Sequence, residues 1–119
     1  MSNFNTKSDG KSFDEATIEA VWQKGKLEPR FRGFRKDAYG ASMQRTNYGK
    51  QEEPFLPPLS KFTHKLLHYQ QEHWGWEIDH IKPVSKGGTD DLSNLQPLQW
   101  ENNRRKGDNY PGSFFKVRS

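Results

Sequence analysis

Four polar residues between positions 79 and 103 have types and spacing that could support hydrolysis. Asp79 and His80 are adjacent, Asn94 follows after thirteen residues, and Asn103 follows Asn94 after eight. Hydrolysis of a phosphodiester needs a base that deprotonates water, and His is the usual choice because its pKa lies near neutrality. It also needs a cation that stabilises the leaving oxygen, and two side-chain oxygens can hold Mg²⁺, which keeps several of its waters. The segment supplies both kinds of group.

Each residue of this set also has an ordinary structural explanation. Asp79 and His80 alone are typical of a hydrogen-bonded strand end, and Asn94 alone is typical of a turn. Asn103 alone fits an exposed helix position. Because all four occur together and in order, the catalytic interpretation is the better hypothesis, and the structure around the motif must test it.

The elements that would position these residues can be predicted from the local pattern. The stretch "WGWEIDHI", residues 74–81, alternates and predicts a strand, "KGGTDD" predicts a flexible connection, and "NLQPL" predicts a short second strand. Residues 99–106 predict a helix that ends at Gly107. Asp79 and His80 would face opposite ways in a regular strand. We therefore expect the strand to end or distort at this pair, before Pro83.

The chain before this motif predicts one helix and a series of short elements. Ser12 and Glu15 have the spacing of a capping box, and an apolar stripe at helical spacing follows until Gly25. Residues 30–50 are punctuated by glycines and predict short strands or loops. Residues 1–11 are polar and predict a disordered tail.

Residues 50–73 form a segment of different character, which we interpret as an insertion. Its first part contains three prolines and cannot be regular structure, whereas residues 60–73 predict a helix with an apolar stripe. His64, His68 and His73 lie in this helix. The first two have a spacing that can bind a metal, but no carboxylate or cysteine accompanies them, and a polar helix face is the preferred interpretation.

Composition limits the fold to one small domain with a modest core. The chain has 119 residues, 30% of them hydrophobic, and a mean hydropathy of −1.15. It contains no cysteine, so neither a disulfide nor a Cys-ligated zinc can stabilise it. The start has no apolar core of a secretion signal, and no stretch is long enough for a membrane span. We expect a cytoplasmic protein without membrane association.

Positive charge is concentrated in residues 24–50, which carry eight Lys and Arg against two acidic residues. Basic residues interleaved with aromatics are typical of a nucleic-acid surface, although a solvated basic face fits the charge equally well. Two groups of candidates for phosphate contact follow from this pattern. They are Arg30, Arg32, Arg35 and Lys36 in the basic segment, and Arg104, Arg105 and Lys106 in the last predicted helix. For the helix residues the preferred interpretation is a mixed use, as phosphate contacts and as C-terminal cations of the helix.

The phrase "IDHIKPVSKGGTDDLSNLQPL" followed by "NNRRKGD" resembles the HNH endonuclease family over nearly all of residues 76–108. Weaker similarity extends over residues 13–110 outside the inserted segment. The resemblance implies an α+β fold in which a ββα-metal core at 74–108 carries flanking helices and the inserted helical segment at 50–73. The single nuclease domain would span residues 12–119. This chain is an HNN variant, with Asn103 where many members have the last His.

The resemblance also implies a role for each polar residue. His80 matches the general base, Asn94 matches the residue that fixes the base and its loop, and Asp79 and Asn103 match metal ligands. Because both ligands are oxygens, the ion would be Mg²⁺ or Mn²⁺. Many members bind a structural zinc through a CxxC pair at the helix entry, where this chain has Gln99 and Asn102, so we expect no such zinc.

These features predict a metal-dependent endonuclease that cleaves DNA, with double-stranded DNA as the expected partner, in a bacterial or phage context. One alternative is a module that binds nucleic acid on the same scaffold without cutting it. A second alternative is a nuclease directed at RNA, or a toxin, that uses the same residues.

Overall fold

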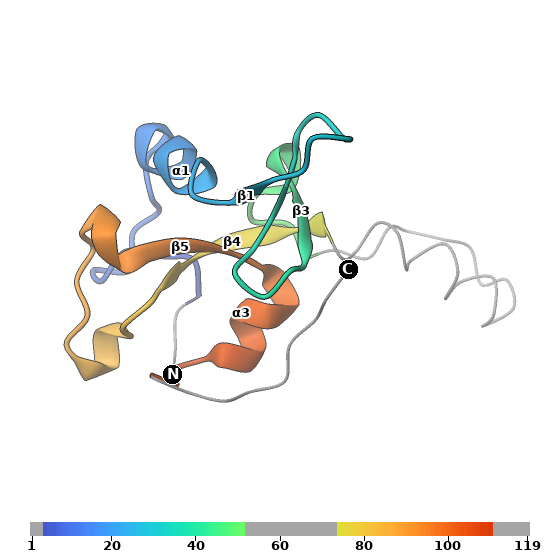
Figure 1. Ribbon diagram of the computed structural model, residues 1–119. Coiled ribbons are helices and arrows are strands. Elements are labelled where there is room, and N and C mark those ends of the chain that lie inside the picture. Colours follow the sequence, from blue (N-terminus) through green and yellow to red (C-terminus); the bar gives the residue numbers. More distant parts are fainter. Residues whose placement is uncertain (1–3, 52–73, 111–119) are drawn as a thin grey trace, which may run out of the picture.

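The computed structural model describes residues 4–51 and 74–110, which fold into two small antiparallel sheets and two α-helices (Figure 1). This mixed architecture agrees with the predicted α+β class. In chain order the helices and strands are α1 (Glu15–Trp22), β1 (Lys26–Leu27), β2 (Phe34–Lys36), β3 (Ser42–Gln44), β4 (Trp76–His80), β5 (Leu95–Gln99) and α3 (Trp100–Lys106). Short 3₁₀ turns lie at Arg45–Asn47, Val84–Lys86 and Leu92–Asn94.

The elements that carry the polar motif form a strand–loop–strand–helix unit, in the predicted order. β4 pairs antiparallel with β5 from Trp76 opposite Gln99 to His80 opposite Leu95. β5 continues directly into α3, and the helix ends at Gly107, whose φ of 51° is a conformation that glycine adopts readily. The ladder is regular through His80 and β4 ends there, so the strand ends at the Asp79–His80 pair as predicted, and it does so without a distortion.

The two faces of the β4–β5 sheet are covered by different helices, α1 on one side and α3 on the other (Figure 1). Trp76 and Ile78 face α1, and the ring centroids of Trp76 and Trp22 lie 5.0 Å apart. Leu95 is fully buried in the same core, whereas Leu92 in the preceding 3₁₀ turn is 45% exposed. The apolar core therefore lies on the α1 face, and the α3 face is left for polar side chains.

Helix α1 begins at Glu15 and is capped by Asp14. The Asp14 carboxylate accepts a hydrogen bond from the backbone N–H of Thr17 at 2.8 Å, which satisfies a donor that the helix leaves free. The expected capping box of Ser12 and Glu15 is therefore wrong, because Asp14 occupies the position directly before the first helical residue.

The N-terminal segment differs from the predicted disordered tail, since residues 4–11 pack along β4. Asn5 Oδ1 accepts hydrogen bonds from the backbone N–H of Ile78 at 2.9 Å and from the Tyr48 hydroxyl at 2.8 Å. Asn5 has a φ of 58°, a left-handed conformation that Asn tolerates better than most residues. The N-terminal segment is ordered here because β5 leaves the N–H of Ile78 unpaired, and a backbone N–H that is shielded from water needs an acceptor.

A buried carboxylate joins the β2–β3 turn to the start of α3. Asp37, 1% exposed, accepts hydrogen bonds from the backbone N–H groups of Tyr39 and Ala41 through Oδ1. Its Oδ2 accepts from Gln99 N at 3.0 Å and from Asn102 Nδ2 at 2.9 Å. Gln99 and Asn102 stand at the positions where the family resemblance implies a zinc-binding CxxC pair in other members. In this chain a network of hydrogen bonds connects the two sheets at that point.

Part of the sequence-based prediction lies outside the described residues. This applies to the inserted helical segment over residues 52–73, to His64, His68 and His73 within it, and to the tail over residues 111–119. Among the described residues, no helix is long and apolar enough to cross a membrane.

Asp37→Asn is expected to destabilise the fold by roughly 2–4 kcal/mol, because an amide nitrogen would face two of the four donors and leave them unsatisfied. Urea denaturation followed by circular dichroism measures the change. The control is Asp9→Asn, where an exposed carboxylate accepts from Lys11 N, and it should shift the free energy of unfolding by less than about 1 kcal/mol. Equal stability of Asp37→Asn and wild type would contradict the structural role of this carboxylate.

Candidate active site

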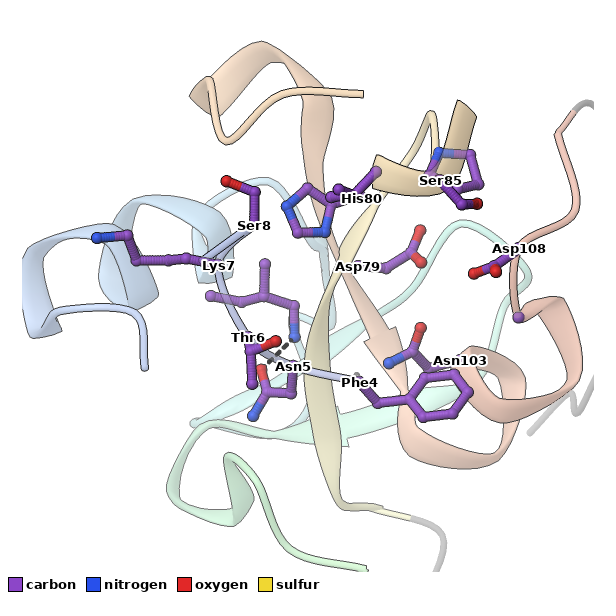
Figure 2. A pocket seen from close by; sticks show the side chains of 14 residues that line it. Phe4, Asn5, Thr6, Lys7, Ser8, Asp79, His80, Ser85, Asn103 and Asp108 are labelled. Carbon is purple, nitrogen blue, oxygen red and sulfur yellow. Dashed lines mark hydrogen bonds between the residues drawn. The ribbon is translucent and has the colours of Figure 1, made fainter. Parts of the chain in front are cut away.

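A pocket of about 320 Å³ opens where the N-terminal segment, β4 and the end of α3 meet (Figure 2). Three of the four predicted polar side chains, Asp79, His80 and Asn103, line it. The other lining residues are Phe4, Asn5, Thr6, Lys7, Ser8, Ile78, Pro83, Val84, Ser85, Gly107 and Asp108. The structure therefore brings together residues from both ends of the strand–loop–strand–helix unit, and adds an N-terminal wall that the sequence did not predict.

Asp79 and His80 both line this pocket, although their side chains point to opposite faces of β4. Asp79 points toward α3, where it meets Lys106, and His80 points toward the α1 side, where its ring centroid lies 6.1 Å from that of Phe13. The pocket lies along the edge of β4 that does not pair with β5. Side chains from both faces of the strand can reach this edge, so no distortion of the backbone is needed.

Asn103 presents a buried oxygen to the pocket. Its side chain is 2% exposed, and its Nδ2 donates a hydrogen bond to Glu77 Oε1 at 2.8 Å. A carboxylate can only accept, so this contact fixes which end of the amide is the oxygen. No donor among the described residues bonds to Asn103 Oδ1, and Figure 2 shows this oxygen on the side of Asp79. An orphaned buried oxygen beside a carboxylate fits a hard divalent cation.

Asp79 is the second oxygen donor, and it is already partly neutralised by a buried lysine. Its Oδ1 lies 3.2 Å from Lys106 Nζ, which also donates to the backbone oxygen of His80 at 3.0 Å, and its Oδ2 accepts from Gln96 Nε2 at 2.9 Å. Burial raises the pKa of Asp79 above its usual value, although the hydrogen bond from Gln96 and the charge of Lys106 act in the opposite direction. A cation bound at Asp79 would compete with the Lys106 ammonium.

Glu77 orients Asn103 and holds the arginine that follows it. The Glu77 side chain is 1% exposed and pairs with both guanidinium nitrogens of Arg104, at 2.8 and 2.9 Å. The ring of Phe4 lies against the same guanidinium, 4.0 Å from its carbon. The sequence analysis did not select Glu77. A signal was present, because Glu77 stands two positions before Asp79 and therefore shares its face of the strand.

Two further polar side chains, those of Asn94 and Asp90, hold the β4–β5 loop and the His80 ring. Asn94 does not line the pocket, but its side chain accepts from Lys82 N at 2.8 Å and donates to the backbone oxygens of Lys82 and Thr89, so it closes the β4–β5 loop. Asp90, which the sequence analysis did not select, places Oδ1 2.8 Å from His80 Nε2.

The basic residues of the last helix fall into two groups. Arg105 is exposed. Arg104 and Lys106 are occupied by Glu77 and Asp79, and the Lys106 side chain is only 5% exposed. Their first role in this structure is thus to neutralise buried carboxylates, which differs from the surface contacts that the sequence predicted.

The basic residues of the β1–β2 hairpin lie away from the pocket, since none of them lines it. Arg30 and Arg32 are exposed. Lys36 lies 3.9 Å from Glu28, and Arg35 donates to the backbone oxygen of Gly25 at 2.8 Å. Lys7, which lies in the N-terminal segment, is the lysine that lines the pocket, and the expected disorder of that segment concealed it.

Residues 69–109 match the model of the HNH endonuclease family, so the chain carries an HNH endonuclease domain. This confirms the resemblance seen in the sequence, and the matched residues include β4, β5 and α3. The chain matches no curated protein and no solved structure. It has no cysteine with which to ligate zinc. Over the described residues, no three His, Asp or Glu side chains gather as a metal site, so a cation here would depend on Asn103 and on water.

Lys106→Met is expected to destabilise the metal-free protein by about 3–5 kcal/mol near neutral pH, because the buried charge of Asp79 loses its partner. The pKa of Asp79 would rise further. A carboxyl whose pKa is higher in the folded state stabilises the fold below its unfolded pKa, and this contribution is lost as the pH rises through the folded pKa. The destabilisation should therefore be smaller at pH 5 than at pH 7.5.

Urea denaturation at the two pH values, in the presence of a chelator, measures this difference. The double variant Asp79→Asn/Lys106→Met is the control, and it should lose the added pH dependence because no buried carboxyl remains at position 79. The same destabilisation of Lys106→Met at both pH values would rule out Asp79 as its cause.

Proposed function

We propose that this protein is a metal-dependent endonuclease that hydrolyses phosphodiester bonds in double-stranded DNA. His80 would act as the general base, and Asp79 and Asn103 would hold one Mg²⁺ or Mn²⁺. The observation that carries this proposal is the convergence of these three side chains on one pocket of an HNH endonuclease domain, with the Asn103 oxygen buried and unpartnered among the described residues.

The chemistry assigned to the protein side chains is a single displacement at phosphorus. His80 takes a proton from a water molecule, the water oxygen forms a bond to phosphorus, and the bond between phosphorus and the 3′ oxygen breaks. The 3′ oxygen takes a proton from solvent, which leaves a 5′-phosphate and a 3′-hydroxyl. A divalent cation supplies charge stabilisation for the leaving oxygen when it is bound by Asp79 and Asn103.

Contacts to the nucleic-acid backbone are assigned to basic side chains that remain exposed. Arg30 and Arg32 extend from the β1–β2 loop and Arg105 from α3, and the Arg30 side chain is 76% exposed. Lys7 adds a positive charge at the pocket itself. Arg104 and Lys106 would act mainly through the carboxylates that they neutralise. Phosphate contacts of this kind supply affinity rather than sequence specificity.

His80→Ala is expected to abolish cleavage while leaving fold and DNA affinity unchanged, because the imidazole is partly exposed and is assigned to proton transfer. Loss of a general base lowers rates by about 10²–10⁴-fold. Nicking of supercoiled plasmid in Mg²⁺ or Mn²⁺ measures the rate, and a fluorescence anisotropy titration measures binding.

The same assays separate the rival functions. Wild-type protein that binds DNA as tightly as His80→Ala but cuts no substrate would be a binding module. Competition between plasmid and structured RNA identifies the preferred nucleic acid, and faster cleavage of the RNA would assign the site to an RNA nuclease.

Asp79→Ala and Asn103→Ala are each expected to weaken Mn²⁺ binding by about tenfold or more. Removing a residue that merely orients a metal ligand already lowers affinity by about that factor, and these variants would remove a ligand itself. Asn103→His should keep part of the activity and shift the metal preference toward ions that bind imidazole. Calorimetric titration with Mn²⁺ tests these variants, with Asp9→Asn as the control of unchanged affinity. Wild-type affinity in Asp79→Ala would remove this carboxylate from the metal site.

A further inference from the structure

A side-chain carboxylate holds the imidazole of His80 from the side that faces away from Asp79. Asp90 Oδ1 lies 2.8 Å from His80 Nε2, and the two side chains are 30% and 12% exposed. Asp90 stands in the β4–β5 loop, ten positions after His80. The roles implied by the family resemblance did not include this residue.

The contact determines which nitrogen of the neutral ring can act as a base. A carboxylate has no proton to donate, so His80 Nε2 must carry the hydrogen of this bond, and the lone pair then lies on Nδ1. Among the described residues, Nδ1 has no hydrogen-bond partner. In Figure 2 the His80 ring lies between Ser8 and Asp79, with one ring nitrogen on each side. Ser8 and His80 Nε2 bond to the same Asp90 carboxylate, so Nε2 is the nitrogen on the side of Ser8, and Nδ1 is the nitrogen on the side of Asp79.

Asp90 is itself fixed by the N-terminal segment. The backbone N–H of Ser8 donates to Asp90 Oδ1 at 2.9 Å, and the Ser8 hydroxyl donates to Oδ2 at 2.6 Å. Burial acts to raise the pKa of Asp90, but the hydrogen bonds from Ser8 and His80 outweigh it and hold this pKa below its usual value. The carboxylate thus remains charged and keeps its role as an acceptor.

We propose that Asp90 is the positioning residue of His80, and that Ser8 holds Asp90 in place. Asp90 keeps the hydrogen on Nε2, so that Nδ1 accepts the proton of the attacking water. It also places a negative charge beside the imidazolium that this transfer creates. The proposal rests on the proposed function, in which His80 is the general base. It gives the N-terminal segment a part in positioning the base.

The discriminating variant is Asp90→Asn, which keeps the shape of the side chain but can turn an N–H₂ donor toward Nε2. The hydrogen of the ring would then move to Nδ1, and the base would lose its lone pair. We expect kcat for plasmid nicking to fall by about 10²–10⁴-fold, the range for loss of general base catalysis. KM and DNA affinity should stay near the wild-type values, because Asp90 contacts the base and not the substrate.

The tautomer of His80 provides a second readout that does not depend on activity. Nitrogen-15 chemical shifts of the imidazole, assigned by comparison with His80→Ala, should show hydrogen on Nε2 in the wild type and on Nδ1 in Asp90→Asn. Ser8→Ala removes only the hydroxyl bond and should lower kcat by less than Asp90→Asn does.

Asp91→Asn is the matched control, since Asp91 is in the same loop but bonds to Thr89 instead of His80. It should keep both kcat and the wild-type tautomer. The inference is overturned if Asp90→Asn cleaves like the wild type, if its tautomer is unchanged, or if Asp91→Asn loses activity equally. Because wild-type cleavage and its loss in His80→Ala are measured separately, failure of the inference leaves the proposed function standing. An inactive wild type would instead reject the proposed function.

Discussion

Two buried carboxylates on one face of β4 determine where α3 lies. Glu77 binds Arg104 and the amide of Asn103, and Asp79 binds Lys106, so three positions of the helix are attached to two alternate positions of the strand. Buried ion pairs add little net stability, but breaking one leaves a charge without a partner. The pairs therefore act mainly by excluding other registers of helix against strand, and this register delivers Asn103 to the pocket.

The strand–loop–strand–helix unit could be predicted because its signals are local. Alternation identified β4, the glycines identified the loop, and Gly107 identified the end of α3. Asp79, His80, Asn94 and Asn103 could be selected because they lie in one continuous stretch with a specific spacing. For such a stretch, the order along the chain indicated that Asp79, His80 and Asn103 approach one pocket, whereas Asn94 closes the loop instead.

The supporting contacts could not be predicted because their partners are far apart in sequence. Asn5 bonds to Ile78 across 73 positions, Ser8 to Asp90 across 82, and Asp37 to Gln99 across 62. The polar N-terminal segment buries too little apolar surface to predict order. Its order comes from a few hydrogen bonds to groups that the rest of the fold leaves unsatisfied, and composition carries no information about such groups.

Beyond Trp76, where Tyr48 forms an isolated bridge, the edge of β4 away from β5 has no strand partner among the described residues. This open edge would allow the proposed ligand and base to serve one phosphate. If a further strand paired with this edge, its backbone would fill the space in which side chains from opposite faces of β4 can meet. The N-terminal segment instead satisfies the N–H of Ile78 through the Asn5 side chain. The edge is thereby protected from pairing with other chains, while a pocket of about 320 Å³ remains beside Asp79 and His80. Because the Asn5 side chain, and not a further strand, accepts from the Ile78 N–H, the strand edge is hydrogen-bonded and the pocket beside Asp79 and His80 remains open.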